Sequence, residues 1–172
     1  MAIPDHISPL RLDIFKPLRK KQHQKICQSL DPKLIGFLNA QTRDEAIGSL
    51  IDLLAQTGKV PDKASFRDAI FHRENLLSTA IGMGVSIPHA KMKSFSEFLV
   101  AVGIQKKKGV DWQALDEIPV RIIFMIGGPE DKQSEYLQIL SQITSAIKNV
   151  ELRKALLIAQ SPEQVVNLFS DF

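Results

Sequence analysis

The chain has 172 residues, of which 44% are hydrophobic and 24% charged, and its formal net charge at neutral pH is +3. This length predicts one compact domain, and this composition excludes a disordered chain and a membrane protein. No apolar run is long enough to span a bilayer and the N-terminus lacks the apolar core of a secretory signal, so we expect a cytoplasmic protein without stable membrane insertion.

The basic charge is concentrated at the N-terminus, where residues 1–25 hold six Lys or Arg against two Asp. The remaining residues, with 16 basic and 17 acidic groups, are nearly balanced. We interpret residues 1–30 as a basic leader, partly helical around Lys20 to Ser29, and residues 31–172 as the folded domain. An RNA or anionic-membrane role would have to lie in the leader, but solvated charge is the simpler interpretation, so we expect no nucleic-acid partner.

The helical signals become clear after the leader. Thr42 followed three residues later by Glu45 is a capping box, and the apolar spacing behind it predicts an amphipathic helix that stops at Gly58. A second helix is expected over about residues 62–72.

Two short apolar runs follow, residues 98–104 and 120–126, both rich in β-branched side chains and typical of strands covered on both faces. After the second run the chain turns through Gly127-Gly128-Pro129 into a helix whose predicted apolar stripe consists of Leu137, Leu140, Ile143 and Ile147. A short helix comes next, and the last one opens with Ser161-Pro162-Glu163-Gln164, a cap followed by an N1 proline. This alternation predicts an α/β single domain with a central mixed, mostly parallel sheet and helices on both faces.

Residues 79–91, TAIGMGVSIPHAK, interrupt a strand-like run with two glycines, a proline and a histidine. Gly82 and Gly84 permit unusual backbone dihedrals and the close approach of another group. Pro88 fixes its own φ and restricts the residue before it, so His89 emerges from a stiffened segment. Such a segment aims the ring, which is what a nucleophile needs.

The charges near His89 indicate what the ring would attack. A neutral imidazole is a competent nucleophile near pH 7. Arg73 lies at the end of the preceding helix and Lys91 two residues beyond the histidine, and cations in these places suit a phosphoryl group. A purely structural histidine is the alternative that the spacing leaves open.

Other kinds of site fit less well. The G-x-G-x-x-G nucleotide fingerprint fails at Ile87, and no P-loop motif occurs. His6, His23 and His72 are scattered without ligand spacing, and the single cysteine, Cys27, has no second thiol for a disulfide or a thiolate site. We therefore expect neither a metal nor an organic cofactor.

The run RENLLSTAIGMGVSIPHAK, residues 73–91, resembles the signature of the fructose/mannitol-type enzyme IIA domains of the bacterial phosphoenolpyruvate-dependent phosphotransferase system, including the nitrogen-regulatory IIA proteins. The similarity extends more weakly over about residues 34–169 and does not include the basic leader. The positions that match in order and spacing are Arg73, Glu74, Ser78, Thr79, Gly82, Gly84, Ile87, Pro88 and His89.

This resemblance implies that His89 receives a phosphoryl group from an HPr-type phosphocarrier protein and can pass it onward, while Arg73 steadies the phosphoryl oxygens. Lys91, Gly84 and Ser86 would support the phosphoryl site. The onward partner would be a IIB protein or a regulatory target. A single domain without a fused IIB or membrane segment favours the regulatory, nitrogen-type role over sugar uptake.

One position departs from the family pattern. Where the family usually presents a second histidine, in the helix after Gly127-Gly128-Pro129, this chain has Tyr136. A phenol can donate a hydrogen bond to a phosphoryl oxygen but carries no positive charge at pH 7. Tyr136 either supports transfer in the place of the histidine or marks a module of the same fold that binds proteins without transferring phosphate. The alternative is an ordinary amphipathic-helix residue with its hydroxyl at the surface.

Overall fold

The structure is a computed structural model that describes residues 26–172. Residues 1–25, with most of the expected basic leader and the start of the helix expected around Lys20 to Ser29, lie outside the described residues. The described part begins with a short 3-10 helix, η1 (Ile26–Ser29), and Ile26 and Leu30 are buried in the core. The domain boundary at residue 30 stays a prediction.

Six strands form one sheet in the described part of the chain. Its order is β1-β5-β6-β3-β2, and β4 also pairs with β6. β5 and β6 are antiparallel to each other, as are β2 and β3, whereas β1 pairs in parallel with β5, and β3 and β4 pair in parallel with β6. The sheet is therefore mixed, as predicted. Its strands are β1 (Ile35–Leu38), β2 (Ala80–Gly82), β3 (Val85–Ser86), β4 (His89–Lys91), β5 (Leu99–Gln105) and β6 (Ile122–Gly128).

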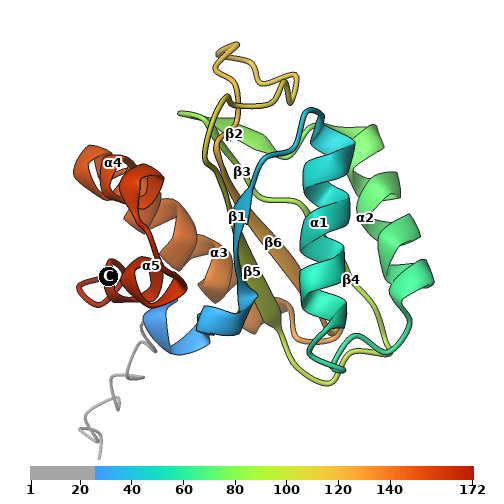
Figure 1. Ribbon diagram of the computed structural model, residues 1–172. Coiled ribbons are helices and arrows are strands. Elements are labelled where there is room, and N and C mark those ends of the chain that lie inside the picture. The colour runs from blue at the N-terminus through green and yellow to red at the C-terminus, as the bar shows by residue number, and fades with distance from the viewer. Residues whose placement is uncertain (1–25) are drawn as a thin grey trace, which may run out of the picture.

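Two helices cover one face of this sheet (Figure 1). α1 (Arg43–Ala55) begins after Thr42, whose side-chain oxygen accepts a hydrogen bond from the Glu45 backbone N–H at 3.1 Å, so the capping box is confirmed. α2 (Lys63–Leu76) begins after its cap, Asp62, and ends four residues beyond the predicted end at residue 72. The longer helix places residues 73 and 74 in its last turn.

Three helices cover the opposite face: α3 (Gln133–Ile147), α4 (Val150–Ile158) and α5 (Pro162–Asn167) (Figure 1). The predicted stripe on α3 is partly wrong, because Leu137 is 51% exposed while Tyr136 is buried and Leu140 is only partly buried. The predicted stripe contains only aliphatic residues, but the aromatic ring of a tyrosine packs inward as well as a leucine side chain does. Compared with the predicted orientation, α3 is rotated about its own axis, and this rotation brings Tyr136 to the sheet.

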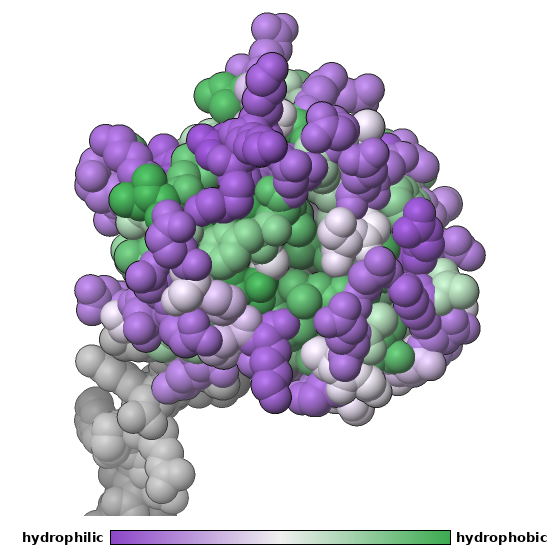
Figure 2. Space-filling model, viewed as in Figure 1, coloured by the Kyte–Doolittle hydropathy of each residue, from purple (hydrophilic) through white to green (hydrophobic). Residues whose placement is uncertain are grey.

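The core lies between the sheet and both helical layers, and every residue of β5 and β6 is buried. The surface in Figure 2 is mostly hydrophilic, with hydrophobic side chains gathered in the middle of the view, over β1. No helix within residues 26–172 combines the length and apolar character needed to cross a membrane. The predicted α/β domain with helices on both sheet faces is confirmed.

Candidate functional site

The segment that carries His89 is a tight hairpin followed by a sheet strand. Gly82, Met83 and Gly84 all have positive φ, so the turn between β2 and β3 is left-handed over three residues. A Cβ on Gly84 would lie 3.3 Å from the carbonyl oxygen of Pro119. The glycine is therefore needed for the turn and for close packing, and its neighbours are in the 118–119 loop rather than around the imidazole.

His89 is the first residue of β4 and its backbone pairs with Ile126 of β6. Its ring is partly buried, and Nδ1 lies 2.9 Å from the carbonyl oxygen of Ile87. A carbonyl can only accept a hydrogen bond, so Nδ1 carries the proton. In the neutral ring the free lone pair is then on Nε2, the atom that would act as nucleophile.

Tyr136 and Lys91 lie beside this ring. The rings of His89 and Tyr136 are 5.5 Å apart between centroids, at an interplanar angle of 43°. Lys91 follows His89 on the same face of β4, and its Nζ lies 4.7 Å from the centre of the Tyr136 ring, where it also donates a hydrogen bond to Gln133. The strand and the start of α3 thus bring an imidazole, a phenol and an ammonium group together.

Arg73 reaches the same corner from the last turn of α2. Its guanidinium donates a hydrogen bond of 2.8 Å to the carbonyl oxygen of Leu77, a neutral acceptor. The arginine also acts electrostatically on His89 and on Tyr136, which places its positive charge close to both rings. The predicted group of His89, Arg73, Lys91 and Tyr136 is therefore assembled in space from three elements.

Burial is the largest influence on the pKa of His89 and lowers it below its ordinary value of 6.5. The positive charges of Arg73 and Lys91 lower this pKa further, while the hydrogen bond to Ile87 and the carboxylate of Glu74 raise it. Burial raises the pKa of Tyr136, and Arg73 opposes that shift. At pH 7 the imidazole is therefore mainly neutral and the phenol keeps its proton.

Sequence reasoning assigned no role to Glu74, although it was among the matching positions. Its side chain is 2% exposed, and its carboxylate oxygens accept hydrogen bonds from the backbone N–H of Thr79 at 2.8 Å, the hydroxyl of Thr79 at 2.6 Å and Nε1 of Trp112 at 2.9 Å. A signal was present in the sequence, because Glu74 continues the buried row of Phe66 and Ile70 at a spacing of four residues.

Ser86 was also predicted to support the site. It is fully buried in β3, and its hydroxyl is without a hydrogen-bond partner among residues 26–172. Its role at the phosphoryl site stays a prediction. The described residues contain no cluster of three or more His, Cys, Asp or Glu side chains arranged to hold a metal ion.

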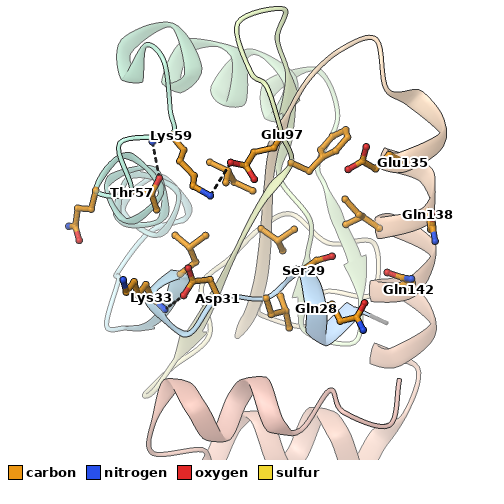
Figure 3. Close-up of a pocket in the computed structure, with 17 residues that line it drawn as sticks. Gln28, Ser29, Asp31, Lys33, Thr57, Lys59, Glu97, Glu135, Gln138 and Gln142 are labelled. Atoms are coloured by element: carbon orange, nitrogen blue, oxygen red, sulfur yellow. Dashed lines mark hydrogen bonds and ion pairs between the residues drawn. The ribbon is translucent and has the colours of Figure 1, made fainter. Parts of the chain in front are cut away.

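A cavity of about 540 Å³ lies away from His89, between η1, the end of α1, the start of β5 and α3 (Figure 3). Charged and amide side chains surround it, and a Lys59–Glu97 ion pair of 2.9 Å crosses one side. Phe98 lines the cavity and its ring lies 6.3 Å from that of Tyr136. The ring of Tyr136 is therefore close both to the imidazole and to the wall of the cavity.

Comparison with known proteins decides the family. Residues 28–172 match the family of EIIA 2 of the phosphoenolpyruvate-dependent sugar phosphotransferase system. The chain belongs to this family. The resemblance of residues 73–91 to enzyme IIA domains is confirmed, and the match covers nearly all of the described residues.

Two EIIA relatives and one solved structure illustrate the likeness. The chain is 34% identical over 130 residues to the fructose-specific EIIA component of Haloferax volcanii, covering 76% of this chain and 84% of that protein. It is 32% identical over 133 residues, or 77% of its length, to the fructose-specific EIIABC component of Bacillus subtilis, of which it spans only 21%. The crystal structure of nitrogen regulatory protein IIA-Ntr from Neisseria meningitidis superimposes with a TM-score of 0.77 at 25% identity, covering 84% of this chain and 99% of that one.

Proposed function

We propose that this EIIA-family chain is a phosphocarrier in which His89 accepts a phosphoryl group from an HPr-type phosphohistidine protein and passes it on. The observation that carries the proposal is the partly buried, neutral imidazole, held by the Ile87 carbonyl with Nε2 as its free lone pair and with Arg73 close by. A nucleophile aimed in this way loses little orientational freedom at the moment of attack.

The bonds and electrons of the transfer step balance without a cofactor. The Nε2 lone pair forms the new N–P bond while the P–N bond of the donor breaks, and that electron pair returns to the donor's imidazole. Nothing is oxidised or reduced, and the Nδ1 proton of His89 stays in place. The ring of His89 gains positive charge, and the phosphoryl oxygens carry negative charge.

The cations at the corner suit those oxygens. Arg73 is bonded to a neutral carbonyl, so its positive charge remains for the transferring group. Lys91, held over the Tyr136 ring, adds a second charge, and the Tyr136 hydroxyl offers a neutral donor where the family usually has a histidine. Gly84 and Ser86 support the site through the hairpin and β3, which set where β4 begins.

The destination of the phosphoryl group is a partner protein in the cytoplasm, and we place this chain in phosphotransferase-system regulation. Phosphorylation adds about two negative charges to a cationic corner, which changes the partners that can dock there. The likeness in fold and sequence to a nitrogen regulatory protein supports this role. A second candidate, delivery to a sugar-specific IIB protein, is favoured by the fructose-specific names of two relatives.

The test is phosphorylation of the full chain by enzyme I, an HPr-type carrier and phosphoenolpyruvate, read by intact mass and by the acid lability of the product. We expect one phosphoryl group on the wild type and none on His89→Gln, whereas His72→Gln, on the exposed side of α2, should label normally. No labelling of the wild type beside an active control domain would reject the carrier role and leave a module that only binds proteins. Onward transfer to a IIB protein of fructose type would favour the second candidate.

A further inference from the structure

A buried chain of hydrogen bonds connects the carboxylate of Glu74 to the ring of His89. Thr79 donates its backbone N–H to Glu74 at 2.8 Å, and its carbonyl oxygen accepts from the Ile87 N–H at 3.1 Å. The carbonyl oxygen of Ile87 in turn lies 2.9 Å from Nδ1 of His89. Trp112 and the Thr79 hydroxyl fix the far end of this relay by donating to the same carboxylate.

Glu74 is also the negative charge among the ionised groups that act on His89. The others, Arg73 and Lys91, are positive, and Tyr136 beside the ring is neutral. The chain thus places Arg73 and Glu74 side by side in one helical turn, with the cation toward the phosphoryl site and the anion in the interior. The positive charge of Arg73 suits the negative phosphoryl oxygens, and the negative charge of Glu74 suits the ring, which becomes positive.

We propose that Glu74 is a positioning residue for phosphoryl acceptance, whose buried negative charge stabilises the imidazolium that forms at His89 and whose hydrogen bonds hold the segment that aims the ring. This inference rests on the proposed function. A carboxylate that directly contacts a catalytic imidazole does the same in hydrolase triads. Here the carbonyl oxygen of Ile87 contacts the ring, and the carboxylate is connected to the ring through Thr79 and Ile87.

The alternative is that Glu74 only stabilises the corner between α2 and β2, and two variants separate these roles. In Glu74→Gln the amide oxygen can still accept from Thr79 and Trp112, and the amide N–H can donate to the Thr79 hydroxyl, so the bonds persist while the charge is lost. Glu74→Asp keeps the charge but is one methylene too short to reach both partners. Glu135→Gln, an exposed carboxylate at the start of α3, is the matched control.

The measurements are the titration of the His89 ring in the full chain by two-dimensional ¹H–¹⁵N NMR and the rate of phosphoryl acceptance. We expect Glu74→Gln to lower the pKa of His89 further and to slow acceptance about tenfold, a smaller loss than that caused by removing a carboxylate in direct contact. Glu74→Asp should titrate like the wild type even where its melting temperature falls. Glu135→Gln should match the wild type in both measurements.

An unchanged His89 titration and rate in Glu74→Gln would overturn the inference and leave Glu74 with a structural role. If Glu74→Gln does not fold, a lowered His89 pKa in Glu74→Asp overturns it equally, because that variant retains the charge. Failure of the proposed function looks different: the wild type would not label at all. The NMR titration needs no phosphoryl donor, so it would still decide whether Glu74 acts on the ring.

Discussion

The corner around His89 and the cavity of Figure 3 both have a ring close to that of Tyr136, and they use their charges in different ways. In the cavity Lys59 is paired with Glu97 at 2.9 Å, and both side chains are more than half exposed. At the corner Arg73 bonds only a neutral carbonyl among the contacts described, while the one nearby carboxylate, Glu74, is buried behind it. The Lys59 charge in the cavity is thus neutralised by an ion pair, whereas the Arg73 charge at the corner remains for an incoming anion.

Removal of Arg73 should have the largest effect on this contrast. Arg73→Ala deletes a cation that acts on His89 and would balance the phosphoryl oxygens, and loss of one such donor commonly costs about 100-fold in rate. We expect phosphoryl acceptance to fall by that order while the chain stays folded by circular dichroism. Lys59→Ala removes a cation from the cavity and should change the rate less than about twofold. Equal losses in the two variants would contradict the distinction between the regions.

Lowering the pH should slow phosphoryl acceptance through the corner around His89 alone. Because burial, Arg73 and Lys91 lower the pKa of His89, the neutral ring persists below the ordinary value of 6.5 and the initial rate should be constant down to that pH. Below the lowered pKa the rate should fall about tenfold for each pH unit, as protonation removes the Nε2 lone pair. Initial rates of labelling, quenched in base because phosphohistidine is acid-labile, give the profile. A midpoint at or above pH 6.5 would contradict the assignment of the cause to burial.

The lowered pKa of His89 also makes the stability of the folded chain depend on pH, in a defined direction. A histidine whose pKa is lowered in the folded state binds a proton more tightly when unfolded. The free energy of unfolding should therefore decrease as the pH falls through 6.5, and His89→Gln should remove that part of the dependence. Urea denaturation of both proteins between pH 5 and about pH 8 measures the difference. Parallel curves for the two proteins would show that His89 titrates normally.

Substitutions of Tyr136 test how the corner around His89 is related to the cavity. Tyr136→Phe keeps the ring beside His89 and Phe98 but removes the hydroxyl, so we expect a loss in acceptance rate of about threefold, near one neutral hydrogen bond in size. Tyr136→Ala removes the ring as well and should reduce stability by about 3 kcal/mol, since the side chain is 6% exposed. A Phe variant as slow as Arg73→Ala would mean that the phenol, not the arginine, is the main partner of the phosphoryl group.

The smallest effect should come from the ion pair of the cavity. Lys59→Ala or Glu97→Ala breaks an exposed pair, and such pairs contribute less than about 1 kcal/mol. Thermal unfolding should show a shift of a few degrees at most, and the phosphorylation assay should show none. A loss of labelling in Glu97→Ala would connect the cavity to the transfer site through Phe98 and Tyr136.

Local signals predicted much of this structure. The caps at Thr42 and Ser161 act within three residues along the chain, and both are present in the structure. The two central strands were predicted because a run buried on both faces must be apolar throughout. The grouping of His89, Arg73, Lys91 and Tyr136 came instead from the resemblance to enzyme IIA domains, whose motif holds three of them in one short segment and whose second histidine corresponds to Tyr136.

The features that escaped prediction depend on contacts across the sequence. The bond from Trp112 to Glu74 spans 38 positions, and no local pattern pairs the two residues. β1 forms beside β5, far along the chain, and was not predicted as a strand. The rotation of α3 depends on which side chain fills the space beside His89, so an apolar pattern alone placed Leu137 inside and left Tyr136 out.

The most direct test of the central claim is to identify the modified atom. Two-dimensional ¹H–¹⁵N NMR of the uniformly ¹⁵N-labelled chain, before and after incubation with phosphoenolpyruvate and the carrier proteins, resolves both ring nitrogens of each histidine. We predict that neutral His89 carries its proton on Nδ1 and that the phosphoryl group then appears on Nε2 of the same ring. A phosphoryl group on Nδ1, or on another histidine, would contradict the account.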